Sequence, residues 1–107
     1  MAEVCLNTED VGDWDSFHRK CKEVLGFPDF YGENMDAWID CLSYLDEGDG
    51  MSRFHLAKNE MLLIEITDTK RFNQRVPEIF DALVECSAFV NFRYERPVIA
   101  LVFTDRR

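Results

Sequence analysis

The most informative stretch of this chain reads Pro28-Asp29-Phe30-Tyr31-Gly32-Glu33-Asn34-Met35-Asp36-Ala37-Trp38-Ile39-Asp40-Cys41-Leu42. Pro28 restricts the residue before it to extended backbone, which indicates a turn. Asn34 is a good helix N-cap, because its side chain can accept hydrogen bonds from free backbone N–H groups. From there apolar and acidic residues recur at helical spacing. The stretch therefore predicts a turn that leads into an amphipathic helix with an acidic outer face.

This predicted helix has an acidic side and an apolar side. Glu33, Asp36 and Asp40 are expected to form one acidic stripe, because residues three and four apart are neighbours on a helix. The helix dipole favours acids in the first turn, which accounts in part for Glu33 and Asp36, whereas Asp40 lies beyond its reach. The stripe is either a solvated face or a binding surface. The other side carries the apolar residues Ala37, Trp38, Cys41, Leu42 and Leu45.

Three aromatic and apolar residues beside the stripe could add contact area to a binding surface. Ile39 lies between the apolar and acidic sides and is expected to be partly exposed, either as an interface anchor with a charged surround or as a border of the core. Of Phe30 and Tyr31, which precede the helix, we expect Tyr31 to pack under the helix start.

The charge of the chain is unevenly placed. The 107 residues have a net charge of −9, but residues 1–50 hold 13 acids and 3 bases, whereas residues 51–107 hold 8 acids and 9 bases. Between Lys22 and Arg53 there are eight acids and no base. Such a protein repels nucleic acid and anionic membranes and attracts basic surfaces. The charge therefore predicts a basic partner.

On both sides of this stretch, strand patterns and helix patterns alternate along the chain. Strands are expected at 3–7, at 60–66 and at 98–103, and the continuous apolar run of the second predicts a strand covered on both faces. Asp13 and Gly26 bound a helix between the first strand and the turn. Asp68 is expected to cap a short helix, and Pro77 to open a longer one with Ile79, Phe80, Leu83, Val84, Ser87 and Val90 on one face.

Strands separated by helices imply parallel pairing through right-handed crossovers. We therefore expect an α/β fold, a parallel sheet of three strands flanked by helices, in one domain spanning 1–107. The connection 45–59 is long for a compact domain. Within it, residues 46–50 (Asp46-Glu47-Gly48-Asp49-Gly50) faintly resemble a calcium loop but lack its ligand order, so a mobile loop is the favoured interpretation.

Other polar residues point to no second chemistry. The four cysteines form no C-x-x-C pair, and three are expected to be small core residues. His18 and His55 lack a nucleophile at a recognisable spacing and are expected at the surface or its boundary. Lys70, Arg71 and Arg75 are expected to form a solvated face. We expect no metal and no cofactor. Residues 1–12 contain acids and no apolar run, so we expect no signal peptide and a cytoplasmic protein.

The stretch Tyr31-Gly32-Glu33-Asn34-Met35-Asp36-Ala37, followed by Trp38, Asp40, Cys41 and Leu42, resembles the signature of the barstar family of ribonuclease inhibitors. The resemblance implies a three-stranded parallel sheet flanked by helices. It also implies that the helix matching Asn34–Tyr44 and the loop before it plug a ribonuclease active site, with Asp40 as the deepest acid and Asp36 as a flanking one. The partner-binding residues it implies are Phe30, Asn34, Met35, Asp36, Ile39, Asp40 and Tyr44.

Several positions depart from the family pattern. Phe30 stands where the best-known member has Tyr, and Ile39 where it has Trp. A further acid of the last long helix falls at Ala82, with Asp81 adjacent. These departures leave open a second hypothesis, an interaction module of the same fold with a non-nuclease target. A third, a small enzyme using Asp36 and Asp40 as acid and base, is disfavoured because two acids on one helix cannot easily flank a sugar from opposite faces.

Overall fold

The computed structural model describes residues 2–47 and 50–105, and within these ranges it contains three strands, four α-helices and two 3-10 helices. Their order alternates along the chain as the sequence predicts, and the long connection 45–59 has no helix or strand in its described part. The elements are β1 (Ala2–Leu6), η1 (Thr8–Asp10), α1 (Trp14–Leu25), α2 (Met35–Cys41), η2 (Leu42–Tyr44), β2 (Leu62–Ile66), α3 (Thr69–Arg75), α4 (Pro77–Tyr94) and β3 (Ile99–Phe103).

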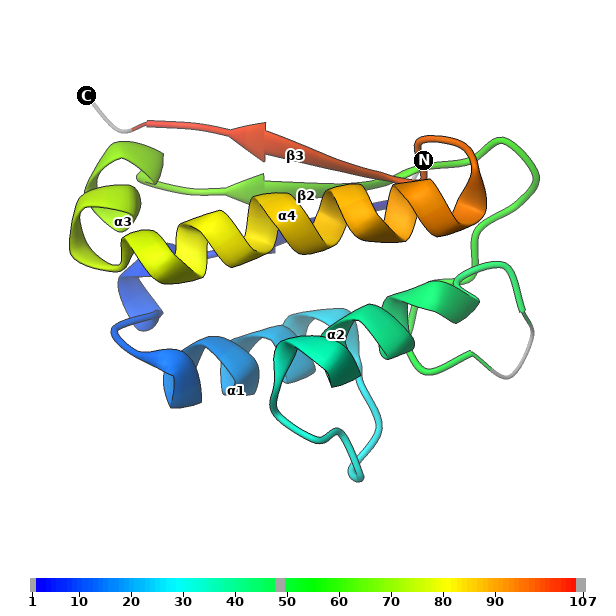
Figure 1. The fold of residues 1–107 in the computed structure, drawn as a ribbon, viewed down its shortest axis with the longest axis horizontal. Coiled ribbons are helices and arrows are strands. Elements are labelled where there is room, and N and C mark those ends of the chain that lie inside the picture. Colours follow the sequence, from blue (N-terminus) through cyan, green and yellow to red (C-terminus); the bar gives the residue numbers. More distant parts are fainter. Residues whose placement is uncertain (1, 48–49, 106–107) are drawn as a thin grey trace.

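The three strands form one parallel sheet in the order β1-β2-β3, which confirms the predicted α/β class. Val4 pairs with Ile64, and Ile64 pairs with Leu101. Figure 1 shows α4 running alongside the strands and α1 and α2 lying next to each other below them. Both α1 and α4 pack on the sheet, against β1 and β3 respectively, whereas α2 packs against α4. Both ends of α1 are fixed by the residues that the sequence indicates. Asp13 caps its N-terminus in a capping box, and Gly26 ends it in left-handed backbone.

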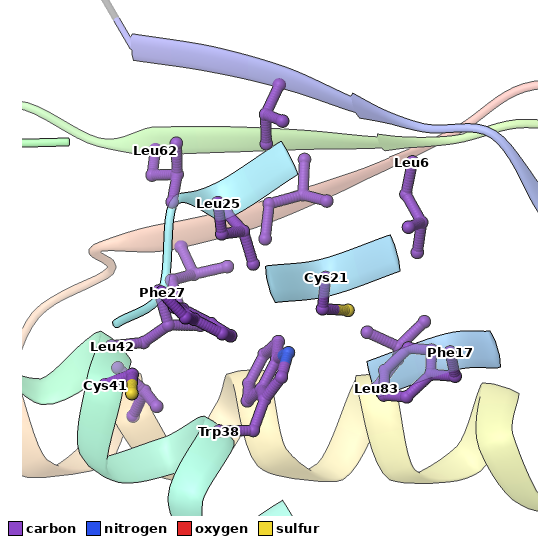
Figure 2. Close-up of a cluster of buried hydrophobic side chains, with 14 of the residues drawn as sticks. Leu6, Phe17, Cys21, Leu25, Phe27, Trp38, Cys41, Leu42, Leu62 and Leu83 are labelled. Carbon is purple, nitrogen blue, oxygen red and sulfur yellow. The ribbon is translucent and has the colours of Figure 1, made fainter. Parts of the chain in front are cut away.

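The core fills the space between the sheet and the helices. Leu6 and Leu62 point from the sheet towards α1, and Trp38 and Leu83 reach the same space from α2 and α4 (Figure 2). Figure 2 places Cys21 of α1 in the middle of this layer, and burial raises the pKa of its thiol to about 12. Cys41 is also buried, Cys86 half-buried and Cys5 exposed, and all four cysteines are free. Two of the four are therefore core residues, where three were expected, and Cys86 packs against the core while partly exposed.

The prediction that the second strand is covered on both faces is wrong. Along β2 the residues alternate between buried and half-buried, and the outer face also carries the exposed Glu3, Cys5 and Val102. A shallow hollow of about 410 Å³ opens there, lined in part by Leu63 and Glu65. The apolar run misled because Leu63 is shielded by its neighbouring strands rather than by a second layer of helices.

Two expectations about the later helices also need correction. Asp68 occupies the N-cap position of α3, but its side chain makes no capping bond. The N–H groups of Thr69 and Lys70 instead donate to the Thr104 carbonyl and the Asp105 carboxylate, so the segment that follows β3 replaces the cap. On α4, Val84 is 40% exposed, because the buried face follows Ile79, Leu83, Ser87 and Val90.

Two polar side chains expected at the surface or its boundary have structural contacts instead. His18 is buried and lies against Tyr31. Arg75 is exposed, but its guanidinium donates to the carbonyls of Val11 and Thr8 and so ties α3 to the segment after β1. His55, Lys70 and Arg71 are exposed as expected.

The connection after η2 is held at several points. Arg53 donates from its backbone to the Leu25 carbonyl and from Nε to the Val24 carbonyl, which satisfies the C-terminal end of α1. Leu56 is buried, and its N–H donates to the Leu45 carbonyl at 2.7 Å. The interpretations of residues 46–50 fall partly on Gly48 and Asp49, which lie outside the described residues.

Candidate functional site: the acidic face of α2

The turn before α2 is held from inside, by Tyr31. Its ring is buried against Phe27, with 4.7 Å between ring centroids, and its hydroxyl lies 2.6 Å from Nδ1 of His18. Its N–H also donates to the Pro28 carbonyl, which closes the turn. Phe30 is consequently directed outwards and is 75% exposed. Tyr31 therefore packs under the helix start as predicted, and it fixes the backbone that displays Phe30.

Asn34 begins α2 as its N-cap, as the sequence predicts. Its side-chain oxygen accepts from the Ala37 N–H at 2.8 Å, and its amide nitrogen donates to the Gly32 carbonyl at 3.3 Å. Glu33 precedes the cap in left-handed backbone, with φ of 53°. The expected stripe of three helical acids is therefore wrong in one member, since Glu33 lies outside the helix. The amide of Asn34 is already engaged in holding the helix start.

The helix divides into an inner and an outer face, as predicted. Trp38 is fully buried and Cys41 nearly so, whereas Asp36 and Asp40 are exposed. Figure 2 shows the Trp38 ring reaching from α2 into the core between Phe27 and Cys21. Among the described residues, the Trp38 indole N–H and the Ser87 hydroxyl are buried without a hydrogen bond of normal geometry. The indole N–H does interact with the Cys21 thiol, whose pKa it lowers against the larger effect of burial. Apolar packing therefore anchors the helix and fixes the direction of its acids.

Ile39 and Met35 lie at the border between these faces. Both are half-buried and packed against the core. Ile39 is therefore partly exposed beside Asp40, as the sequence predicts, and its remaining surface is available for apolar contact. Met35 fills space at the first turn of the helix.

The two acids of α2 have different electrostatic surroundings. Asp36 lies in the first turn, where the positive end of the helix dipole stabilises a carboxylate. Asp40 is the penultimate residue of the helix, where the dipole opposes its charge. Arg93 of the neighbouring helix α4 faces Asp40, and its Nη1 lies 3.9 Å from Oδ1 of that acid. Arg93 thus supplies the positive charge that the helix itself does not.

The far end of the face is a shallow polar hollow. Ser43, Tyr44, Arg93 and Tyr94 line a space of about 210 Å³. The Ser43 hydroxyl donates to the Ile39 carbonyl at 2.7 Å, and Tyr44 is 40% exposed. The Tyr94 hydroxyl accepts from the Leu45 N–H, and burial is the main cause of the raised pKa of that tyrosine. Tyr44 therefore stands at the rim with its ring accessible.

On α4 the position expected to carry a further acid does not provide one. Ala82 is half-buried, and Asp81 is exposed about 100° round the helix from it. The charge of Asp36 contributes to a raised pKa of Cys86, after burial and Glu85, which places Asp36 beside that part of α4. No hydrogen bond or ion pair joins Asp81 to α2 in the described part of the chain.

From the sequence we expected an acid from α4 but did not identify Phe89, Phe92 and Arg93, the residues by which this helix extends this part of the surface. Phe89 is 46% and Phe92 77% exposed, and the Arg93 guanidinium lies 5.8 Å from the Phe89 ring centroid. The exposure of two phenylalanines on one helix was not readable from the pattern, because α4 is apolar on much of its circumference. Only the packing of α4 against α2 brings Arg93 to Asp40.

Neither a metal cluster nor a membrane-spanning helix is found among the described residues. They contain no group of three or more His, Cys, Asp or Glu side chains placed to hold a metal ion. In the same ranges, no helix is both long enough and apolar enough to cross a membrane. What the structure presents is a small α/β protein with a fixed acidic helix bordered by exposed aromatic side chains.

Comparison with known proteins identifies the family to which this chain belongs. The family model described as Barstar (barnase inhibitor) matches residues 1–104, and the chain therefore belongs to the barstar family. A relative from Bacillus subtilis (strain 168), named "Putative ribonuclease inhibitor YrdF", is 37% identical over 43 residues. That alignment covers 40% of this chain and 47% of the relative, so the chain spans about half the length of the curated relative it matches.

Proposed function

We propose that this protein inhibits a ribonuclease by inserting the acidic face of α2, with the turn before it, into the basic active site of the enzyme. The observation that carries the proposal is the opposed placement of Trp38 and Asp40. The first is fully buried and the second projects from the other side of the same short helix, with its side chain 65% exposed. The family membership and the name of the relative support the same function.

The geometry suits a surface that mimics phosphate. A ribonuclease cleft must be basic to hold its substrate, and Asp36 and Asp40 offer carboxylates at fixed positions. Because the helix is capped and packed before binding, little ordering remains to oppose association. The surrounding negative charge also raises the association rate at low salt. Asp40 is proposed to pair with the deepest cations of the cleft and Asp36 with those at its margin.

Apolar residues around the acids would contribute the remaining contact area. Phe30, Ile39 and Tyr44 all have exposed surface beside the acids. A charged pair surrounded by apolar side chains that exclude water is the usual arrangement of an energetic centre in an interface. Met35 and Asn34 would act mainly through the helix start. In this proposal the protein is not an enzyme; it works in the cytoplasm as the immunity partner of a ribonuclease toxin.

The proposal is tested by the affinity of Asp40→Ala for a ribonuclease that the wild type inhibits. Removing the acid leaves a buried cation of the enzyme unpaired, so binding should weaken by about 2–5 kcal/mol. Asp10→Ala is a suitable control, because it also removes one acid but at a place outside the proposed surface. Asp10 belongs to η1 and pairs with Lys20 of α1. A loss below about threefold for Asp40→Ala, in a protein of unchanged stability, would remove Asp40 from the site.

A second function is favoured by the departures from the family pattern. Phe30, Ile39 and Ala82 differ from the best-known member at positions of the proposed surface. An interaction module that binds a basic protein other than a nuclease would use the same acids with altered apolar neighbours. Co-expression with candidate ribonuclease toxins separates the two, since rescue of growth from any one of them supports inhibition.

A further inference from the structure

Arg93 introduces a positive charge into a face that is otherwise acidic. The sequence has no base between Lys22 and Arg53, so α2 and both of its flanks lack one. Arg93 comes from α4, and its Nη1 lies 3.9 Å from Oδ1 of Asp40, the acid to which the proposed function assigns the deepest contact. A cation of a target that reaches Asp40 must therefore meet Arg93.

The ion pair between Arg93 and Asp40 is weak enough for a target to break it. The side chains of Arg93 and Asp40 are 46% and 65% exposed, and 3.9 Å lies at the outer limit for an ion pair. Exposed pairs of this kind change an equilibrium by a factor of only about 1.5 to 5. A target that brings several cations can exceed this, whereas the pair still reduces the affinity of weak basic competitors.

From the same position the Arg93 guanidinium also has a neighbour on α4 itself. The Phe89 ring centroid lies 5.8 Å from the Arg93 guanidinium carbon, and Phe89 is 46% exposed. Cation–π contact at such an exposed site is weak but favourable. Arg93 can therefore release Asp40 and remain beside Phe89, one turn away on the same helix.

We propose that Arg93 is a specificity-determining residue: it is the internal counterion of Asp40 in the free protein and is displaced when a target binds. This inference rests on the proposed function for its biological meaning. A partner that offers cations alone must overcome the loss of the Arg93 pair. A partner that also places a carboxylate beside its cations gives Arg93 a new counterion, so the residue favours basic targets with an adjacent acid over uniformly basic ones.

The test uses a fluorescently labelled hexa-arginine peptide, a probe with cations and no carboxylate side chain, and anisotropy at low ionic strength. Arg93→Gln removes the charge and keeps a similar stem. Lys70→Gln is the matched control, because Lys70 is exposed on α3 and its loss changes the net charge by the same amount. Both variants are repeated in an Asp40→Asn background, where the pair cannot form.

Arg93→Gln should tighten peptide binding by about two- to fivefold more than Lys70→Gln, and Asp40→Asn should abolish that difference. Equal effects of the two substitutions, weaker binding by Arg93→Gln, or a difference that persists with Asp40→Asn would overturn the proposal. So would the absence of measurable peptide binding by the wild type. Failure to inhibit any ribonuclease, with the peptide result intact, would instead remove only the proposed function.

Discussion

Replacing Tyr31 by Phe tests how the turn that carries Phe30 is held. The substitution removes one oxygen and keeps the ring, which remains packed 4.7 Å from Phe27, so no cavity opens. The lost hydroxyl lies 2.6 Å from Nδ1 of His18, and His18 is only 3% exposed. Burial lowers the pKa of His18 and so favours the neutral ring, to which the tyrosine O–H can donate.

The expected loss of stability comes from the buried ring nitrogen of His18, which is left without its hydrogen-bond donor. A buried acceptor deprived of its donor costs about 1–3 kcal/mol, which is a large part of the 5–15 kcal/mol typical of a domain. Urea unfolding at pH 7.5 should therefore give a lower midpoint for Tyr31→Phe with an unchanged slope. Tyr44→Phe is the matched control, since Tyr44 is 40% exposed and should change stability by less than about 0.5 kcal/mol. Equal stabilities of the two variants would refute this account of the turn.

Three further predictions concern the scaffold of the site. Asn34→Ala removes the 2.8 Å cap of α2 and should lower the free energy of unfolding by about 1 kcal/mol, whereas Asn34→Asp should retain most of it; equal losses would contradict the capping role. Gly26→Ala should destabilise by more than about 1 kcal/mol, because φ is +68° and the new Cβ would lie 2.6 Å from Cβ of Arg53; Gly12→Ala, in open space, should be nearly neutral, and similar urea midpoints would contradict this. Burial lowers the pKa of His18 despite the opposing charges of Glu33 and Asp15. The free energy of unfolding should therefore be highest above the unfolded-state pKa of about 6.5 and should decline as the pH falls below it. His18→Gln should flatten that decline in urea titrations between about pH 7.5 and 5, and an unchanged dependence of stability on pH would exclude His18 as its cause.

Local signals predicted most of the fold. Asp13, Asn34 and Gly26 act within a few residues of themselves, and each bounds its helix where the sequence indicates. The parallel order of strands also followed from their separation by helices. The errors arose where distant segments decide. Asp68 was expected to cap α3, but residues Thr104 and Asp105, more than thirty positions later, satisfy the N–H groups instead.

In the candidate site, too, local pattern predicted some residues correctly and tertiary structure decided the others. The outward direction of Asp36 and Asp40 could be predicted, because it depends only on helical spacing and on Trp38 facing the core. Glu33 could not be placed correctly, since the pattern does not reveal that the backbone turns left-handed before the cap. Arg93 could not be found at all, because the approach of α4 to α2 is a tertiary contact between residues 53 positions apart.

In the proposed function, Asp36 and Asp40 neutralise a ribonuclease. The most direct test of this proposal is growth of bacteria that express a panel of ribonuclease toxins, barnase included, together with this protein or with its Asp36→Ala/Asp40→Ala double variant. The wild type should restore growth against at least one toxin, and the double variant, present at the same soluble level, should not. Equal rescue by both proteins would contradict the role of the acidic face, and rescue from no toxin would contradict ribonuclease inhibition.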